Sequence, residues 1–105
     1  MNQFGLNEDE CDLLTTVFQR HPEIMEVRIF GSRAKGNHEK MSDIDLAFWG
    51  DITWQSLARL SGELDELPLP YTFDLSAYDT VQNRHLKEHI DRAGRILYRR
   101  EQTVG

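Results

Sequence analysis

Two short stretches decide how this sequence is interpreted: FGSRAKG at residues 30–36 and SDIDLA at residues 42–47. The first stretch begins at the end of Ile24–Phe30, a run in which Val27 and Ile29 share one face, as they would on a strand. The second opens Asp43–Trp49, a second predicted strand. The polar segment Gly31–Lys40 contains two glycines, and it is predicted to be the loop between the strands.

The acidic pair at the start of the second strand indicates a metal site. Side chains alternate along a strand, so Asp43 and Asp45 point to the same face with their α-carbons roughly 6.6 Å apart. Hard divalent cations such as Mg²⁺ prefer oxygen ligands and often keep several waters. Asp43 and Asp45 are therefore predicted metal ligands and catalytic residues.

The loop before that strand has the residue types of a phosphate-binding turn. Gly31 lets the backbone approach a phosphate closely, and Ser32 offers a hydroxyl and its own N–H at the start of the turn. Arg33 and Lys35 add positive charge in the same loop. Together with the acidic pair, these four residues predict a site for a magnesium nucleoside triphosphate.

A third carboxylate is predicted from a later strand, Tyr71–Leu75. Asp74 lies there between apolar neighbours, where a charge is costly unless it is paired or binds a metal. If this strand lies beside Asp43–Trp49, Asp74 joins the other two carboxylates. It would then hold the activating ion or act as the base that accepts a hydroxyl proton.

The remaining pattern predicts the element order αββαβαβ. Asn7 is the expected N-cap of the first helix, and Thr53 is the expected N-cap of the second. The third helix is expected to open at Asp79 or Thr80 and to stop at Gly94 in a left-handed conformation, before a short strand Ile96–Arg99. The apolar stripe of the second helix is expected to face the core: Trp54, Leu57, Leu60, Leu64 and Leu67.

Composition and charge restrict the class of protein. At 105 residues and 39% hydrophobic, the chain is predicted to be one globular domain over residues 1–105, with the last five residues frayed. No signal peptide or membrane span is visible and Cys11 is the single cysteine, so a cytoplasmic protein is expected. A net charge of −6 argues against bulk binding to nucleic acid.

The glycine–serine turn, the Asp43-x-Asp45 pair ten residues later and the strand acid Asp74 resemble the nucleotidyltransferase superfamily that includes the DNA polymerase β palm. The short chain and the two quoted stretches narrow this to the minimal nucleotidyltransferases (MNT), and the resemblance runs from about residue 27 to residue 100. It implies an α/β (α+β) fold with a mixed sheet of about four strands backed by about three helices. It also implies two Mg²⁺ ions, ATP as donor and transfer of a nucleotidyl group to a hydroxyl.

The resemblance further implies a partner. Minimal nucleotidyltransferases are commonly paired with an all-helical HEPN protein, and they act as antitoxins that adenylylate a tyrosine of the ribonuclease toxin. One departure concerns Lys35, where members often have arginine; lysine keeps the charge but loses the bidentate fork. A palm of this length is expected to leave nothing over to grip an acceptor. The acceptor must then be held by a second protein or a second subunit, or must itself be that protein, and both a homodimer and a hetero-oligomer stay open.

Two other functions remain open at this stage. One is an antitoxin that neutralises its partner by covering it, with no catalysis; the other is a nucleotidyltransferase acting on a small-molecule acceptor. The spacing of Arg84 and His89 matches the HEPN ribonuclease signature, but a HEPN site needs a long helical bundle. These two residues are therefore interpreted as a polar helix face.

Overall fold

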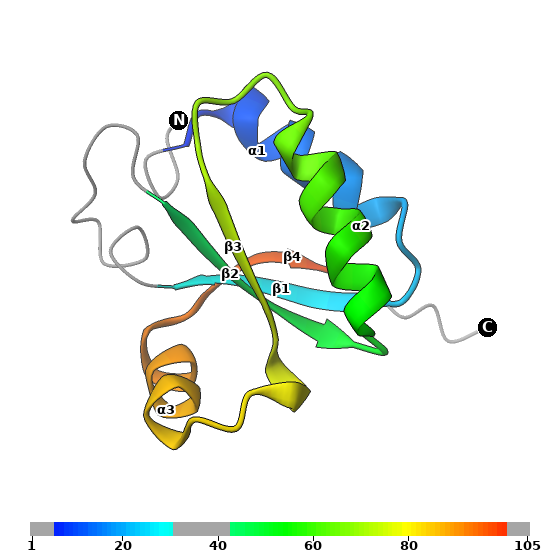
Figure 1. Ribbon diagram of the computed structural model, residues 1–105. Coiled ribbons are helices and arrows are strands. Elements are labelled where there is room, and N and C mark those ends of the chain that lie inside the picture. The colour runs from blue at the N-terminus through cyan, green and yellow to red at the C-terminus, as the bar shows by residue number, and fades with distance from the viewer. Residues whose placement is uncertain (1–5, 31–42, 101–105) are drawn as a thin grey trace.

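The computed structural model describes residues 6–30 and 43–100, and the predicted order of elements is confirmed there (Figure 1). The predicted loop, including Gly31, Ser32, Arg33 and Lys35, lies outside the described residues, as do the last five residues. The elements are α1 (Glu8–Gln19), β1 (Ile24–Phe30), β2 (Ile44–Gly50), α2 (Trp54–Asp65), β3 (Phe73–Ala77), the 3₁₀ turn η1 (Tyr78–Thr80), α3 (Arg84–Ala93) and β4 (Arg95–Arg99). No helix in this part of the chain has the length and apolar character needed to cross a bilayer.

The four strands form one mixed sheet in the order β3-β2-β1-β4. β1 pairs antiparallel with both β2 and β4, whereas β3 lies parallel to β2. A parallel neighbour requires a crossover, and α2 supplies it. The predicted fold class, a mixed four-stranded sheet with helices, is confirmed.

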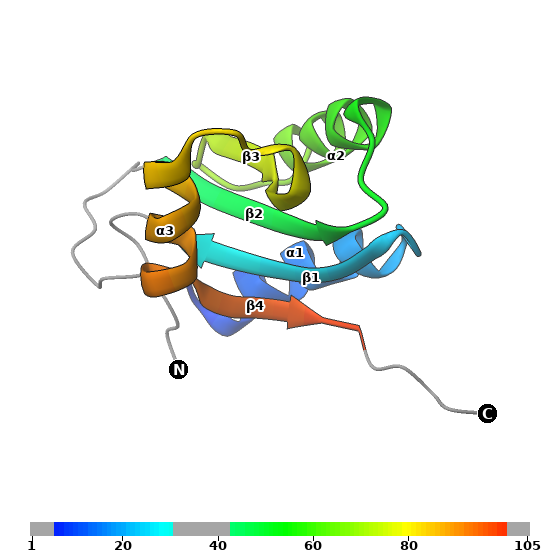
Figure 2. The same ribbon diagram turned by 90° about the horizontal axis from the view of Figure 1, so that it is seen from below.

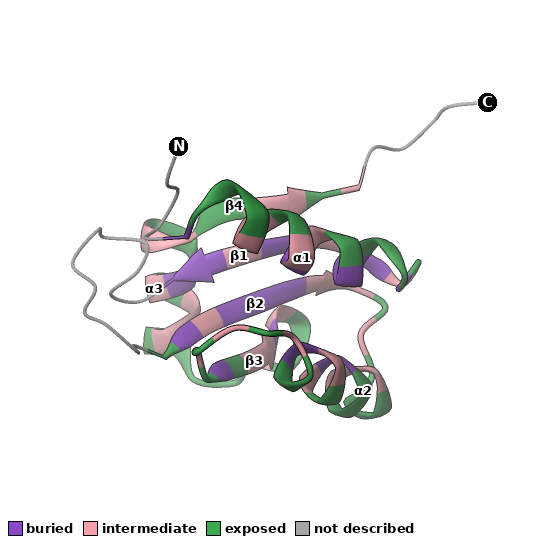
Figure 3. Ribbon diagram, turned by 90° about the horizontal axis from the view of Figure 1, so that it is seen from above, coloured by how far each residue is buried: buried purple, intermediate pink, exposed green. Residues whose placement is uncertain are grey.

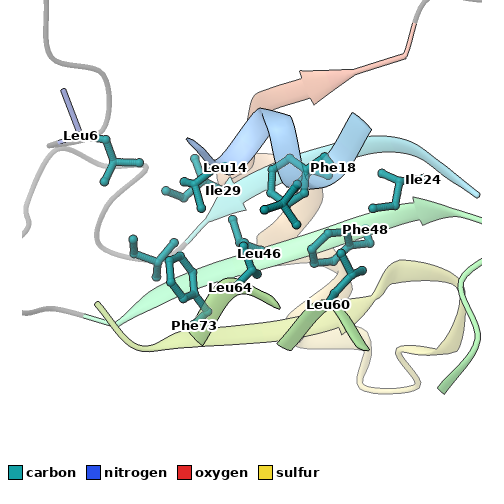
Figure 4. Packing of buried hydrophobic residues seen from close by; sticks show 13 residues of the cluster. Leu6, Leu14, Phe18, Ile24, Ile29, Leu46, Phe48, Leu60, Leu64 and Phe73 are labelled. Atoms are coloured by element: carbon teal, nitrogen blue, oxygen red, sulfur yellow. The ribbon is translucent and has the colours of Figure 1, made fainter. Parts of the chain in front are cut away.

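The main core lies between the sheet and the pair α1 and α2. Phe18 of α1 and Phe48 of β2 meet edge to face, with ring centroids 5.7 Å apart, and Leu60 and Leu64 of α2 are buried beside them (Figure 4). Seen from the side of these helices, the central strands are mostly buried, whereas exposed residues lie along the outer sides of the helices (Figure 3). Burial of this apolar layer is the main favourable term in folding.

A smaller cluster occupies the opposite face, where α3 packs. It consists of Phe30, Ala47 and Ile90, with Trp49, Tyr78 and Leu86 against it. Figure 2 shows α3 crossing the end of the sheet where β2 begins and β1 ends; among the described residues η1 also lies on this side, and no other α-helix does. The two sheet faces are therefore unequally covered.

The starts of two helices are as the sequence predicts, and the start of the third is different. The Asn7 side chain accepts from the Glu10 N–H at 2.8 Å and Glu10 accepts from the Asn7 N–H at 3.0 Å, a complete capping box. Thr53 caps α2 as expected.

The third helix does not begin at Asp79 or Thr80, which belong to η1. In that turn the Thr80 hydroxyl donates to the Ala77 carbonyl. The N-cap of α3 is Asn83 instead.

Two further expectations are wrong. Trp54 is 80% exposed, although it precedes the half-buried Leu57 by three residues. At 3.6 residues per turn, Trp54 lies about 120° around α2 from the buried Leu60 and so does not share its face. Gly94 has φ −66° rather than a left-handed value, and glycine is needed there because a Cβ would lie 2.5 Å from the Ile90 carbonyl oxygen.

Two glycines provide a matched test of these packing arguments. Gly50 has φ +135° and a Cβ there would lie 2.0 Å from the Glu23 carbonyl oxygen, whereas a Cβ at Gly62 in α2 would meet nothing within 4 Å. We expect Gly50→Ala to lower the free energy of unfolding by about 2 kcal/mol or more, and Gly62→Ala to raise it by about 0.5–1 kcal/mol. Urea unfolding followed by circular dichroism measures both, and equal effects of the two variants would contradict the structure.

Candidate active site

Asp45 and Asp74 are direct partners in the register of the parallel pair β2–β3. Adjacent strands lie about 4.8 Å apart, so the two residues sit side by side at the same level of the sheet. Phe30 of β1 is the partner of Asp45 on its other side. The row Phe30, Asp45 and Asp74 therefore crosses three neighbouring strands.

Both carboxylates lie on the face of the sheet that α3 partly covers. On β2, Ile44 and Leu46 belong to the main core, so the alternating Asp45 points to the other side. On β3, Phe73 and Leu75 contact that same core, and Asp74 alternates with them. Asp45 is half-buried, whereas Asp74 is exposed.

Asp43 directly precedes β2 and is exposed. It is two residues before Asp45, which places it on the same side if the extended backbone continues through it. The structure thus brings Asp74 beside the acidic pair, as the sequence requires for a shared site.

The pKa of Asp45 is affected by the neighbouring carboxylates. Its pKa is raised, first because burial penalises the charged form, and then because the Asp74 and Asp43 carboxylates repel its charge. His89 of α3 acts in the opposite direction and lowers the pKa of Asp45. A cation bound among these groups would relieve the repulsion.

His89 was missed as a neighbour of the site, and its interpretation as part of a purely polar face is wrong. It is half-buried, and its ring meets the ring of Phe30 edge-on with centroids 6.0 Å apart. The signal was present in the sequence: His89 follows Leu86 by three residues and adjoins the buried Ile90, so it lies near the inner face of α3. Arg84, its partner in the HEPN-like spacing, is exposed.

The donor set fits Mg²⁺. Within residues 6–30 and 43–100, no three His, Cys, Asp or Glu side chains stand in an arrangement that could enclose a metal ion. Mg²⁺ does not need such an enclosure, because it is usually held by one or two carboxylates together with substrate phosphates and waters. Asp45 and Asp74 side by side, with Asp43 next to them in the chain, offer those carboxylates.

Comparison with known proteins identifies the family. Residues 13–103 match the family described as "Polymerase beta, Nucleotidyltransferase". The chain belongs to this nucleotidyltransferase family. It is 31% identical over 104 residues to a probable protein adenylyltransferase MntA of Haemophilus influenzae, covering 97% of this chain and 90% of that protein.

Solved structures share the fold. A crystal structure of a toxin–antitoxin with AMP-PNP superposes with a TM-score of 0.72 at 19% identity, covering 87% of this chain and 74% of the other. A tri-AMPylated Shewanella oneidensis HEPN toxin in complex with MNT antitoxin gives a TM-score of 0.56 at 18% identity, covering 86% and 70%. The family resemblance drawn from the two sequence stretches is confirmed, and the chain is a nucleotidyltransferase of the MntA type.

Because the pKa of Asp45 is raised in the folded chain, the stability of the fold should depend on the ionisation of this carboxyl. Below the ordinary value of 3.8, this carboxyl is protonated in both the folded and the unfolded chain and costs nothing. As the pH rises through the higher folded pKa, only the folded chain carries the cost of a crowded charge. We expect Asp45→Asn to raise the Tm of the metal-free protein at about pH 7, because the variant lacks the charge that is unfavourable in the folded chain.

The same variant should have a smaller effect near pH 3.5, below the ordinary pKa of 3.8, because the charge that it removes is then largely absent. Thermal unfolding across this range measures the difference, and Asp65→Asn, an exposed change at the end of α2, serves as control. A gain that is independent of pH would contradict the assignment of the cost to the Asp45 charge.

Proposed function

We propose that this chain transfers AMP from ATP, with Mg²⁺, to a tyrosine hydroxyl of a partner HEPN ribonuclease toxin and so acts as its antitoxin. The observation that carries the proposal is the register pairing of Asp45 with Asp74 on the half-open sheet face. The name of the MntA relative and the AMPylated toxin in a structure of the same fold support this donor and this acceptor.

Each acidic residue has a role in the proposal. Asp43 and Asp45 hold the metal ions, and Asp74 binds the ion nearest the acceptor or accepts the proton of the acceptor hydroxyl. Because Asp45 is half-buried and flanked by Asp74, its carboxylate is restricted in position, which suits a group that must orient a substrate. Gly31, Ser32, Arg33 and Lys35 remain the proposed phosphate contacts.

The reaction is a displacement at the α-phosphorus of ATP. The acceptor oxygen forms a bond to that phosphorus, the bond to the bridging oxygen of the β-phosphate breaks, and pyrophosphate leaves. The hydroxyl proton passes to the base or to solvent. Mg²⁺, when bound, neutralises phosphate charge and favours the ionised hydroxyl.

The helices of the described part favour a protein as acceptor. α1, α2 and α3 all pack on the sheet, so none of them forms a separate lobe that could enclose a small acceptor. A protein acceptor brings its own contact surface to the half-open face.

Transfer of label from ATP tests the proposal. With Mg²⁺, α-labelled ATP and the HEPN partner, wild type should label the partner, and Asp45→Asn or Asp74→Asn should reduce the rate by about 100-fold or more, the scale of losing a group that stabilises transition-state charge. Asp65→Asn, on α2 and away from this face, should label at the wild-type rate. Intact-mass measurement of the partner should show one added AMP per modified tyrosine.

Two outcomes would contradict catalysis as the function. Wild type that binds the partner normally but transfers no label would remove the enzymatic claim. An Asp43→Asn/Asp45→Asn variant that still neutralises the toxin fully would favour an antitoxin that acts by covering its partner.

A further inference from the structure

A row of aromatic and basic side chains lies on the α3 side of the sheet, with members on β1, β2, β4, η1 and α3. We call this row the Trp49 strip, and it consists of Arg28, Trp49, Tyr78, Lys87 and Arg99. Arg28, Trp49 and Arg99 line a hollow of about 360 Å³ together with Met25, Glu26 and Arg100. The strip shares its sheet face with Asp45, because Trp49 is four residues further along β2.

The rings of the strip are already stacked. Trp49 and Tyr78 are parallel to within 21°, with centroids 4.5 Å apart. The Arg28 guanidinium lies 4.8 Å from the Trp49 centroid, and the Lys87 ammonium lies 4.9 Å from the Tyr78 centroid. Each ring of the pair therefore has an aromatic neighbour and a cationic neighbour within the strip.

The hollow beside Trp49 carries excess positive charge, because Arg28, Arg99 and Arg100 line it together with Glu26. Glu26 is the acceptor for both Arg28 and Arg99, and it is largely buried, with 12% of its side chain exposed. Asp91 accepts a hydrogen bond from the Tyr78 hydroxyl at 2.6 Å. Arg99 remains 62% exposed, so its guanidinium can meet a second anion from outside.

Charge is also unevenly distributed along the chain. The segment 84–100, which forms α3 and β4, carries six basic and two acidic residues in a chain whose net charge is −6. By contrast, α1 contains four acidic residues and no basic one: Glu8, Asp9, Glu10 and Asp12. Half of the twelve basic residues of the chain therefore lie in the segment 84–100, which supplies Lys87 and Arg99 to the strip.

We propose that the Trp49 strip is the docking surface for an acidic segment of the protein that carries the acceptor hydroxyl. This rests on the proposed function, because it names how the acceptor is held at the same site. Asp45 and Trp49 are about 13 Å apart along β2 at about 3.3 Å per residue, so an extended segment of a few residues spans the distance. The strip supplies attraction where the three carboxylates alone would repel an acidic acceptor.

Peptide binding tests this docking without requiring catalysis. Two fluorescent peptides are compared by anisotropy, each with one tyrosine, flanked by glutamates in one and by lysines in the other. Wild type should bind the glutamate peptide at least about tenfold more tightly, and added salt should weaken that binding. Lys87→Glu/Arg99→Glu should lose this preference, and the neutral pair Lys87→Gln/Arg99→Gln should reduce it.

Arg59→Glu is the matched control, since Arg59 is an exposed base on α2, at the opposite sheet face. It should change the affinity for the glutamate peptide less than twofold. Equal affinity of wild type for the two peptides, or equal losses in Arg59→Glu and the strip variants, would overturn the proposal. The proposal would also be overturned if wild type bound a single-stranded RNA oligonucleotide more tightly than the glutamate peptide, and if the strip variants abolished that RNA binding. If label transfer fails while the glutamate peptide binds as expected, the result contradicts the proposed catalysis but supports the docking surface.

Discussion

The parallel pairing of β2 with β3 is the constraint on which the site depends. Consecutive strands joined by a tight turn would run antiparallel, and the start of one would then lie beside the end of the other. Here α2 carries the chain back across the sheet, so β3 begins next to the beginning of β2. Asp45 and Asp74 are therefore neighbours although 29 positions separate them in the sequence.

The two faces of the sheet differ: one carries the main apolar core, and the other carries the candidate site. The side beneath α1 and α2 holds a continuous apolar core that excludes charged groups. The side beneath α3 has only a small buried cluster, which leaves room for half-buried and exposed charges: Asp45 and Asp74 at one end, and the Trp49 strip further along β2. An acidic end suited to cations and a basic surface suited to an acidic partner thus share one face.

Local signals in the sequence predicted most of the fold. Asn7 and Thr53 cap their helices through side-chain contacts within one turn, and such contacts are legible in a short window of sequence. Failures came where the outcome depends on contacts distant in sequence. Trp54 was assigned to the core stripe of α2 but is exposed, and Gly94 is required by a close carbonyl rather than by its dihedral angles.

For the candidate site, local signals and distant contacts contribute in the same way. The identity of Asp43, Asp45 and Asp74 as candidates came from residue type and strand pattern, whereas the exact pairing of Asp45 with Asp74 needed the register. The expected strand Tyr71–Leu75 corresponds to β3 at Phe73–Ala77. Because the expected bounds are shifted by two residues, they could not establish which residue of β2 pairs with Asp74. The spacing of His89 from Leu86 indicates that it lies near the inner face of α3, whereas its contact with Phe30 follows only from the packing of α3 on the sheet.

A carboxyl titration by NMR addresses the central claim most directly, by following the Asp45 side chain in wild type and in Asp74→Asn. If the two carboxylates are neighbours, the pKa of Asp45 is raised in wild type, falls in Asp74→Asn, and falls in wild type when Mg²⁺ with a non-hydrolysable ATP analogue is added. An Asp45 pKa that responds neither to removal of the Asp74 charge nor to the magnesium nucleotide would contradict a shared metal-binding site.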